Sequence, residues 1–386
     1  MNIIFPNLTR KAAMLAASLS MIVAPLYATT RAAEPGIARS AKAGKSLYEI
    51  VYNPGDDKVY VAATGDWGKD DASINVIDPN SLKIVRQVSL GGNAIFGLGL
   101  NSRTQTLYGT SSISGTVTVI DAKSGKVLTT ITDPTNPKAH VRNVAVDEVA
   151  NKIYVSVVGG FSDDPEKEGP KSAIWVVDGH RNALEDIIID PVKTATGLAL
   201  DSKTGRLYVA DMTQNQVGVF DLATRKRIAH YRAYDESAVT IEISEFSGKR
   251  DNGAQSIAID TKGHRLFVTN PGSGTLTVID SRTGKLLKTV KTGSAPLDVA
   301  WNATSRQVYV TNRGNGDNGT VTVVDGRSYA ILAQLRTGTY PQTITVDPAG
   351  KAVYVSNKAK GLPRGAAPGT PEPEDLNGDT IAVIHP

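Results

Sequence analysis

Cysteine is absent from this chain of 386 residues, and its absence excludes several kinds of site at once. Disulfide bridges, cysteine-ligated zinc, iron–sulfur clusters and cysteine nucleophiles all require a thiol. Aromatic residues are also few, at 6%, whereas the chain has 36 glycines and 19 prolines. This composition is typical of a protein with many turns and short elements rather than of a helical bundle. Because 40% of the residues are apolar, the chain can still bury a full hydrophobic core.

Long apolar runs are also lacking, with one exception near the amino terminus. Two basic residues precede residues 12–28, which are apolar or small and lead into further small residues. A basic start, a short apolar stretch and small residues at its end make up a secretory signal peptide. We therefore expect residues 1–33 to be a signal peptide that is cleaved after Ala28 or Ala33; the alternative is an uncleaved membrane anchor.

Cleavage would change the charge of the chain. The full sequence has a formal charge of +4, but Arg10, Lys11 and Arg31 lie in the expected signal peptide, so the mature chain keeps 39 of the 42 basic residues and all 38 acidic ones. The whole-chain charge therefore overstates how basic the working protein is. No later stretch is long and apolar enough to span a bilayer. We expect a periplasmic monomer that has no membrane span after signal cleavage.

Three strand patterns each recur seven times, and this repetition decides the fold class. In the first pattern an apolar strand ends in Asp, as in VTVID to Asp121, and a last copy ends at His385. In the second an aromatic residue stands between apolar residues, and a third strand precedes each of these. Apolar residues alternate with a period of two in all three patterns, as they do in β-strands. The aromatics that mark the seven repeats are Tyr60, Tyr108, Tyr154, Tyr208, Phe267, Tyr309 and Tyr354.

A fourth strand follows most of these triplets, so each repeat holds four short antiparallel strands. The marker aromatics recur at intervals of 42 to 59 residues, and units of this kind have the size of a propeller blade. The repeats therefore predict an all-β, seven-bladed β-propeller as a single domain over residues 34–386. The last repeat ends at Pro386 after three strands. We expect the N-terminal strand, in Gly36–Gly44, to complete this blade and close the ring.

The repeats also resemble a known family. VYVTN stands at Val308–Asn312, FVTN at Phe267–Asn270 and VYVSN at Val353–Asn357, and these segments match the YVTN-type β-propeller repeat. With its expected signal peptide, seven repeats and closing strand, the chain looks like the YncE group of exported propellers. The resemblance implies the propeller fold over nearly the whole mature chain. It leaves the function open, because that group has been associated with DNA binding while other seven-bladed relatives are quinoprotein dehydrogenase subunits or lactonases.

Ten of the 27 aspartates stand where they are expected to fold turns. They end apolar strands ahead of turns such as DAKSGK or DSKTGR, where Asp accepts hydrogen bonds from its own turn backbone. The other acids, in loops, show no pairing that is typical of a general acid and base, so we expect no catalytic residues. The ten aspartates are Asp78, Asp121, Asp147, Asp178, Asp201, Asp221, Asp260, Asp280, Asp325 and Asp347.

Motifs for metals, nucleophiles and cofactors are lacking as well. The five histidines have no metal-ligand spacing, and no GxSxG motif supports a serine nucleophile. Gly314–Gly319 matches GxGxxG but joins two antiparallel strands, so it lacks the helix N-terminus that binds pyrophosphate. Asp375–Asp379 has the oxygen spacing of a calcium loop, yet its twelfth position would be Pro386, which cannot supply the closing carboxylate. We therefore expect no metal and no cofactor.

The long connections gather on one face of the predicted propeller, which we call the insertion-rich face. Because successive strands alternate in direction, the connections between second and third strands share a face with those between blades. All the long connections are of these two kinds, whereas the opposite, tight-turn face has short turns. Irregular loops at one end of a rigid scaffold are where binding sites usually lie. The long connections are Thr64–Ala72, Gly159–Lys171, Arg232–Ala254, Asn312–Gly319 and Lys358–Gly378.

The insertion-rich face also holds the candidate binding residues. Trp67 is the one tryptophan in a polar loop, and aromatic faces beside cations are what single-stranded nucleic acid needs. The same loops carry acids such as Asp163 and Glu372, so a mixed solvated rim is the alternative. The candidates are Trp67, Lys69, His140, Arg142, Lys193, Asn312, Arg313 and Lys358.

We expect a non-enzymatic binding or scaffold protein that takes an unidentified protein or small-molecule ligand. The two alternatives are single-stranded DNA binding on the same face and a quinoprotein- or lactonase-like enzyme. A convergent polar cluster on the propeller axis would favour an enzyme, because chemistry needs groups that act on one point. A connected basic stripe would favour DNA binding, because phosphates need a row of cations.

Overall fold

The structure is a computed structural model that describes residues 1, 35–66, 68–159, 169–235, 253–314, 319–362 and 370–386. The chain divides into two units between Ala33 and Glu34. Apart from Met1, the expected signal peptide lies outside the described residues, and so does Trp67. Across these described ranges, no helix is long and apolar enough to cross a membrane.

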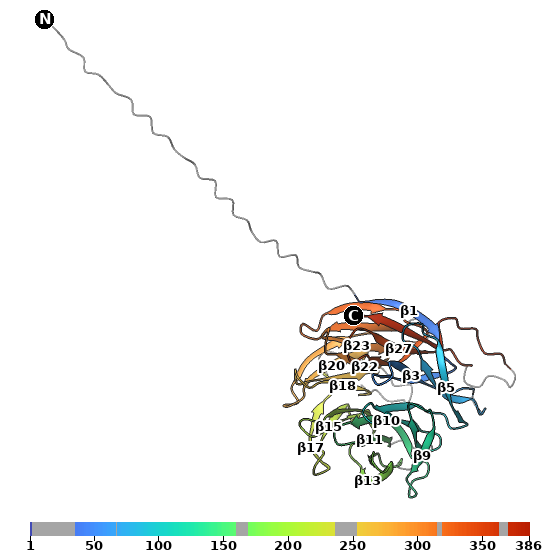
Figure 1. Ribbon diagram of the computed structural model, residues 1–386. Coiled ribbons are helices and arrows are strands. Elements are labelled where there is room, and N and C mark those ends of the chain that lie inside the picture. Colours follow the sequence, from blue (N-terminus) through green and yellow to red (C-terminus); the bar gives the residue numbers. More distant parts are fainter. Residues whose placement is uncertain (2–34, 67, 160–168, 236–252, 315–318, 363–369) are drawn as a thin grey trace. The chain divides into compact units, whose positions relative to one another are not determined.

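The unit from Glu34 to Pro386 is all-β, with seven sheets of four strands each (Figure 1). All seven expected blades are therefore confirmed. The strands are β1 (Gly36–Lys42), β2 (Leu47–Asn53), β3 (Lys58–Ala63), β4 (Ala72–Ile77), β5 (Ile84–Gly91), β6 (Gly97–Asn101), β7 (Thr106–Ser111), β8 (Thr116–Asp121), β9 (Val127–Thr132), β10 (His140–Asp147), β11 (Lys152–Val158), β12 (Ala173–Asp178), β13 (Ala183–Ile189), β14 (Ala195–Asp201), β15 (Arg206–Asp211), β16 (Gln216–Asp221), β17 (Lys226–Arg232), β18 (Ile257–Asp260), β19 (Arg265–Asn270), β20 (Thr275–Asp280), β21 (Leu286–Lys291), β22 (Pro296–Asn302), β23 (Gln307–Asn312), β24 (Thr320–Asp325), β25 (Ile331–Leu335), β26 (Tyr340–Val346), β27 (Val353–Lys358) and β28 (Thr380–His385).

The last blade is closed by the first strand of the chain. Its order is β1-β28-β27-β26, and β1 pairs antiparallel with β28 from Gly36 opposite His385 to Lys42 opposite Thr380. Figure 1 shows the blue strand β1 beside the red strands of the carboxyl terminus. This pairing confirms the expected closing strand, and it satisfies an edge that would otherwise stay open.

The hydrophobic core consists of seven separate clusters, one between each pair of neighbouring blades. The cluster between the last and first blades joins Tyr354 and Val383 to Leu47 and Ile50. The aromatic of every repeat is buried at one of these junctions, as the repeated pattern requires. Each blade thus covers its faces with its two neighbours, which is why the ring must be complete.

The inner strands β2, β6, β10, β14, β18, β22 and β26 lie next to one another around the axis. Five of them carry a register shift at the same place, for example between Leu47 and Ile50 in β2. Two residues at each shift leave the ladder, as in a β-bulge, and their polar groups bond to the next blade instead. In one such bond the Thr311 hydroxyl donates to the carbonyl of Gln342, with an Oγ1–O distance of 3.0 Å. In these five strands the bulge therefore places polar contacts between the start of the inner strand and a neighbouring blade.

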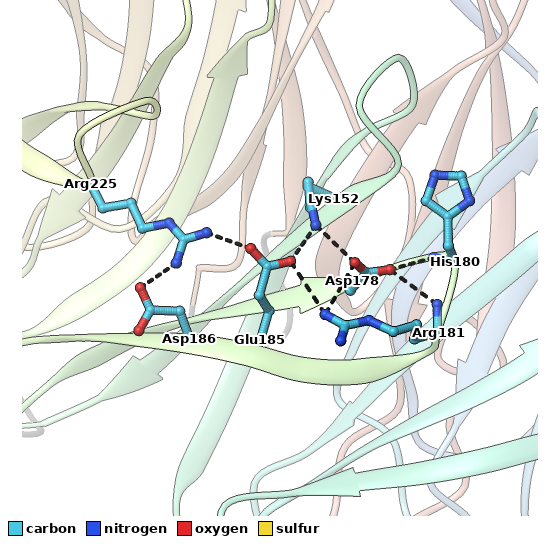
Figure 2. A network of polar contacts seen from close by, with 7 residues as sticks. All are labelled: Lys152, Asp178, His180, Arg181, Glu185, Asp186 and Arg225. Carbon is cyan, nitrogen blue, oxygen red and sulfur yellow. Dashed lines mark hydrogen bonds and ion pairs between the residues drawn. The ribbon is translucent and has the colours of Figure 1, made fainter.

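The tight-turn face is held by the aspartates that end the strands. Asp121 accepts a hydrogen bond from the Ser124 amide at 2.7 Å, and the equivalent aspartates of the other blades accept the same kind of bond. In the third blade Lys152 also lies between Asp178 and Glu185 (Figure 2). Its hydrogen bond is the largest cause that lowers the pKa of Asp178. The turn-forming role of these aspartates is confirmed.

Removal of β1 tests the closure. A chain that begins at Gly44 leaves β28 with an unpaired edge and uncovers part of the cluster around Leu47. We expect its melting temperature to fall by at least about 5 °C relative to a chain that begins at Glu34, measured by differential scanning calorimetry. Equal melting temperatures would show that the ring does not depend on this strand.

Candidate functional site

One position of the repeat forms a ring of side chains around the axis. It lies four residues before the Asp or Asn at or just after the end of each inner strand, and in the five strands that have a register shift it falls within that shift. We call these seven residues the axial ring: Glu49, Gly97, Asn143, Gly197, Ser256, Asp298 and Thr343.

Two members of the axial ring are glycines because the next blade approaches their backbone too closely for a side chain. A Cβ atom on Gly97 would lie 1.8 Å from the carbonyl oxygen of Arg142, and one on Gly197 would lie 2.6 Å from that of Gln255. Real Cβ atoms do not come this near to backbone oxygens. These two blades therefore give the axial ring no polar side chain.

Asp298 joins three neighbouring blades. Its Oδ1 atom accepts a hydrogen bond from the Ser256 hydroxyl at 2.6 Å, and its Oδ2 atom accepts one from the Ile344 amide at 3.0 Å. Asn143 also joins two blades, because its side-chain oxygen accepts a hydrogen bond from the Leu198 amide at 3.0 Å. Both oxygens of Asp298 are thus occupied, which fixes the orientation of its carboxylate.

Glu49 is the second carboxyl group of the axial ring, and it interacts electrostatically with Asp298. Burial, with the negative charge of Asp298 added to it, raises the pKa of Glu49 to about 8, although Arg142 and a hydrogen bond from Thr343 act in the opposite direction. Burial also raises the pKa of Asp298. Glu49 therefore carries a proton at neutral pH. Sequence reasoning did not bring this pair forward, because its members come from the first and sixth blades.

A cluster of aromatic rings and cations lies just outside the axial ring, at the starts of the inner strands. The Arg142 guanidinium donates to the Phe96 carbonyl, with an Nη1–O distance of 2.6 Å, and lies 5.8 Å from the centroid of the Tyr48 ring. Lys358 lies over the same ring, with Nζ 4.3 Å from its centroid, and donates to the Tyr48 hydroxyl at 2.7 Å. Tyr48 and Phe96 meet edge to face, with ring centroids 4.9 Å apart. Tyr48 therefore holds two cations side by side.

A surface cavity extends this cluster towards the connection between β27 and β28. Its volume is about 700 Å³, and its lining includes Arg313, Tyr340, Lys358, Leu362 and Pro371. The Arg313 guanidinium lies over the Tyr340 ring, 5.0 Å from its centroid. Lys358 belongs to both the cavity and the contact with Tyr48, so the two halves are continuous. We call Tyr48, Phe96, Arg142, Arg313, Tyr340 and Lys358 the mouth cluster.

The three cations of the mouth cluster differ from most basic residues around them. Within the described part of the chain, no carboxylate oxygen lies within 4.0 Å of the side-chain nitrogens of Arg142, Arg313 or Lys358. The Nε atom of Arg313 is buried and has no hydrogen-bond partner there. On the tight-turn face, by contrast, Arg225 binds both Glu185 and Asp186 (Figure 2). The positive charge at the mouth is therefore not neutralised by a carboxylate in contact with it.

The structure places the other candidate residues apart from this arrangement or in supporting positions. His140 is in the same strand as Arg142, and desolvation, with the charge of Arg142 added to it, lowers the pKa of the imidazole. Asn312 is buried, and its amide donates to the Thr322 hydroxyl at 2.8 Å, so it packs its own blade. Lys69 lies 3.9 Å from Asp66 on the rim of the first blade.

Lys193 is exposed, and its backbone amide donates to Asp211 at 3.0 Å. The mixed rim that the sequence offers as the alternative is present around Asp66, which also contacts Lys45. Sequence reasoning brought forward Arg142, Arg313 and Lys358, which the structure joins. It missed Tyr48, Phe96, Tyr340 and the two acids of the axial ring.

A signal for the acids was nevertheless present. Aligning the seven inner strands on their final Asp or Asn places Glu49 and Asp298 in a column whose other members are glycine, asparagine, serine and threonine. Two carboxyl groups in a column that faces the axis are costly to bury unless something compensates them. Such a column identifies a site in a repeat protein without any motif.

Three comparisons place the chain among known proteins. A family model described as the SMP-30/Gluconolactonase/LRE-like region matches residues 95–314. The protein YncE of Salmonella typhi is 31% identical over 308 residues, which cover 77% of this chain and 78% of that protein. YncE of Escherichia coli K12 is 27% identical over 270 residues, 68% of this chain and 69% of its own. The solved β-propeller domain of Cps50 (Swd1) from Myceliophteria thermophila is similar in fold alone, with a TM-score of 0.64, 12% identity and coverage of 91% and 99%.

The protonated state of Glu49 predicts how stability depends on pH. Because the pKa of Glu49 is raised from 4.5 in the unfolded chain to about 8, the folded protein keeps a proton that the unfolded chain releases between these values. The unfolding free energy of the wild type should therefore fall as the pH rises from 4.5 to 8, relative to Glu49→Gln, which stays neutral. At about 1.4 kcal/mol per pKa unit, the difference should reach on the order of 4 kcal/mol.

Urea unfolding of both proteins between pH 4 and pH 9 measures this difference. The two curves at pH 4 give the baseline, since Glu49 is mostly protonated in both states there. A difference that stays constant over the whole range would contradict the assignment.

Proposed function

Since the chain belongs to the YncE family of β-propellers, we propose that it is a non-enzymatic binding protein that works after export and holds an anionic ligand at its mouth cluster. One observation carries the proposal. Three cations lie together in the mouth cluster, no carboxylate of the described residues contacts them, and rings and carbonyls orient them instead. This is the arrangement expected of a site whose counter-charge comes from a ligand.

An acid that already pairs with a cation would compete with a ligand for that cation. A cation that is already in an ion pair must break it before it binds another anion, as Arg225 would have to break its contacts with Glu185 and Asp186. A cation that rests on an aromatic face keeps its hydrogen-bond donors available, and that contact contributes only about 0.5–2 kcal/mol. Arginine also matches the two oxygens of a carboxylate, sulfate or phosphate with its planar fork.

The cavity indicates what else the ligand carries. Its volume of about 700 Å³ lies in the range of sites for small molecules. Leu362, Pro371 and the Tyr340 ring give it an apolar wall beside Arg313 and Lys358. These features favour a ligand that has an apolar or ring-shaped body with anionic groups at one side.

Single-stranded DNA is one ligand of this description, since it offers phosphates and ring faces together. Its binding would need the basic surface to continue along the rim. On the side of the first blade, Lys45 contacts Asp66 and Glu372, so the cations there are already compensated. We therefore treat a single strand as an outcome of the binding test rather than as the proposal.

An enzyme is the second candidate, and the axial ring is the observation that favours it. The raised pKa of Glu49, about 8, suits it to donate a proton, and the carboxyl group of Asp298 beside it is held in place by Ser256 and Ile344. The family model whose description includes gluconolactonase points the same way. In this case Glu49 would be the general acid, and the mouth cluster would bind the substrate.

Removing single cations tests ligand binding. We expect the chain from Glu34 onward to bind sucrose octasulfate, a small polyanion, and each of Arg142→Gln, Arg313→Gln and Lys358→Gln to weaken binding about tenfold. Lys203→Gln is the matched control, because it removes an exposed cation from a turn of the opposite face. Isothermal titration calorimetry measures the affinities. No binding near physiological salt, or an equal loss in the control, would contradict the proposal.

The same proteins decide between a small anion and a strand. Fluorescence anisotropy with a labelled oligothymidylate measures how affinity depends on salt, and the slope falls by about 0.7 for each phosphate contact that is lost. Binding tighter than that of sucrose octasulfate, with such a slope, would identify a single strand as the ligand.

The enzyme candidate predicts turnover that depends on Glu49. We expect the wild type to hydrolyse glucono-δ-lactone no faster than buffer does, when acid release is followed at constant pH. A rate well above the spontaneous one that falls roughly 100-fold in Glu49→Gln would replace the binding proposal by the enzyme, since general acids contribute about that much.

A further inference from the structure

One connection, between β27 and β28, supplies the apolar wall of the cavity. Apart from the three members of the mouth cluster that line the cavity, all the lining residues that the structure describes belong to this connection. They are residues 359–362 at its start and Thr370, Pro371 and Pro373 nearer its end. The shape of the cavity therefore depends on what holds these two ends of the connection in place.

Two aspartates just before β28 tie the two ends together. The Lys360 amide donates to Oδ2 of Asp375 at 3.0 Å, and the Ala359 amide donates to Oδ1 of Asp379 at 3.0 Å. Gly378 leaves no room for a side chain between them, because a Cβ atom there would lie 2.2 Å from the Cα atom of Ala359. We call Ala359, Lys360 and Asp375–Asp379 the wall base, since the lining residues lie directly beside or within it.

The closing strand β1 holds the wall base from the other side. The ammonium of Lys42, the last residue of β1, donates to the carbonyls of Asp375 and Gly378, and both Nζ–O distances are 2.6 Å. The next amide, that of Ala43, donates to the carbonyl of Asp379 at 3.0 Å. Hydrogen bonds from a charged donor are shorter and stronger than those between neutral groups, and Lys42 gives the wall base two of them.

Lys45 adds a contact nearer to the cavity. Its ammonium lies 3.0 Å from a carboxylate oxygen of Glu372, whose chain neighbours Pro371 and Pro373 both line the cavity. Both side chains of this ion pair are largely exposed, and Lys45 also contacts Asp66. Because exposed ion pairs contribute little, we treat this contact as secondary to that of Lys42.

We propose that Lys42 is a positioning residue of the cavity, so that the closing strand and the ligand stabilise each other. This inference rests on the proposed function of the mouth cluster. A ligand that packs against Leu362 and Pro371 binds better when the wall base is held, and Lys42 holds it only while β1 is paired with β28. By thermodynamic linkage, a ligand that favours the held wall also favours the paired strand.

Arg39 provides a matched control on the same strand. Its guanidinium donates to the carbonyls of Pro79 and Asn80, with an Nη2–O distance of 3.1 Å for Pro79. These carbonyls lie in the turn between β4 and β5, on the tight-turn face, and neither residue lines the cavity. Arg39 thus ties β1 to the ring through backbone carbonyls, as Lys42 does, but away from the cavity.

Affinity distinguishes positioning from a contribution to stability alone. We expect Lys42→Met to weaken the binding of sucrose octasulfate at least about fivefold, measured by isothermal titration calorimetry, which is the lower end of couplings between sites. Lys42→Arg keeps the charge and the donors and should restore most of the loss. Arg39→Met should bind as the wild type does, even if its melting temperature falls. Equal affinities in the wild type and Lys42→Met, or an equal loss in Arg39→Met, would overturn the inference and leave the proposed function standing.

Hydrogen exchange followed by mass spectrometry measures the reverse effect, on the strand. At saturating sucrose octasulfate, the amides of β1 in the wild type should exchange at least about fivefold more slowly than in the free protein, because the coupling is reciprocal. This protection should be lost in Lys42→Met at saturating ligand. The outer strand β17 of the fourth blade serves as the reference, and its exchange should not respond in either protein.

The outcomes separate the two proposals. Weaker binding by Lys42→Met without protection of β1 in the wild type would assign Lys42 a long-range attraction for the anion and would overturn the coupling. Wild-type binding with unchanged exchange of β1 would likewise overturn the coupling and leave the proposed function standing. No binding by the wild type in either measurement would overturn both.

Discussion

No blade of this protein can cover its own faces, and the whole structure depends on that constraint. Seven hydrophobic clusters lie between neighbouring blades, and the cluster that joins Leu47 to Tyr354 closes the series. Because burial of these faces is the main favourable contribution to folding, an open series would expose two of them. The pairing of β1 with β28 adds hydrogen bonds to the same junction. Closure thus fixes the position of each blade around the ring, and it brings together residues that are distant in the sequence.

The candidate site is a consequence of how the inner strands begin. Their register shifts release two residues from the ladder, so that polar groups which would pair within a blade bond to the next one. Where the released side chain is short, as in Asn143 or Thr343, it joins blades. Where it is longer, as in Tyr48 and Arg142, it reaches the mouth. Structural and functional polar groups are therefore neighbours along the chain, which explains how a rigid scaffold carries an exposed cluster of cations.

Charge is distributed differently on the two faces. On the tight-turn face, Lys152 and Arg225 form ion pairs with neighbouring acids. The hydrogen bond from Lys152 lowers the pKa of Asp178. At the mouth, Arg142 and Lys358 share an aromatic ring instead. Residues 34–386 include 39 basic and 38 acidic residues, so the contrast arises from pairing rather than from an excess of basic residues. Among the described residues, it is the local absence of contacting acids that makes one face suitable for an anion.

How much of this could be predicted from the sequence depends on the range of each interaction. The alternation of apolar residues and the repeated aromatics act within one blade, so the seven blades, the turn-forming aspartates and the closing strand could be predicted. The loops of the insertion-rich face could be assigned because strand direction alone determines the face on which each connection lies. The meeting of Glu49 with Asp298 could not be predicted from motifs, because it depends on the geometry of the closed ring. Tyr48 and Tyr340 were missed for a similar reason, since a tyrosine in an inner strand has no sequence feature that marks it as the support of a cation.

The central claim is that an anion occupies the mouth cluster. A crystal structure of the chain from Glu34 onward, soaked with sucrose octasulfate and located by the anomalous scattering of its sulfur atoms, tests it most directly. The account predicts sulfate groups within hydrogen-bond distance of the Arg142 and Arg313 guanidiniums and the Lys358 ammonium. Sulfur peaks confined to the lysines and arginines of the tight-turn face, with the mouth empty, would contradict it.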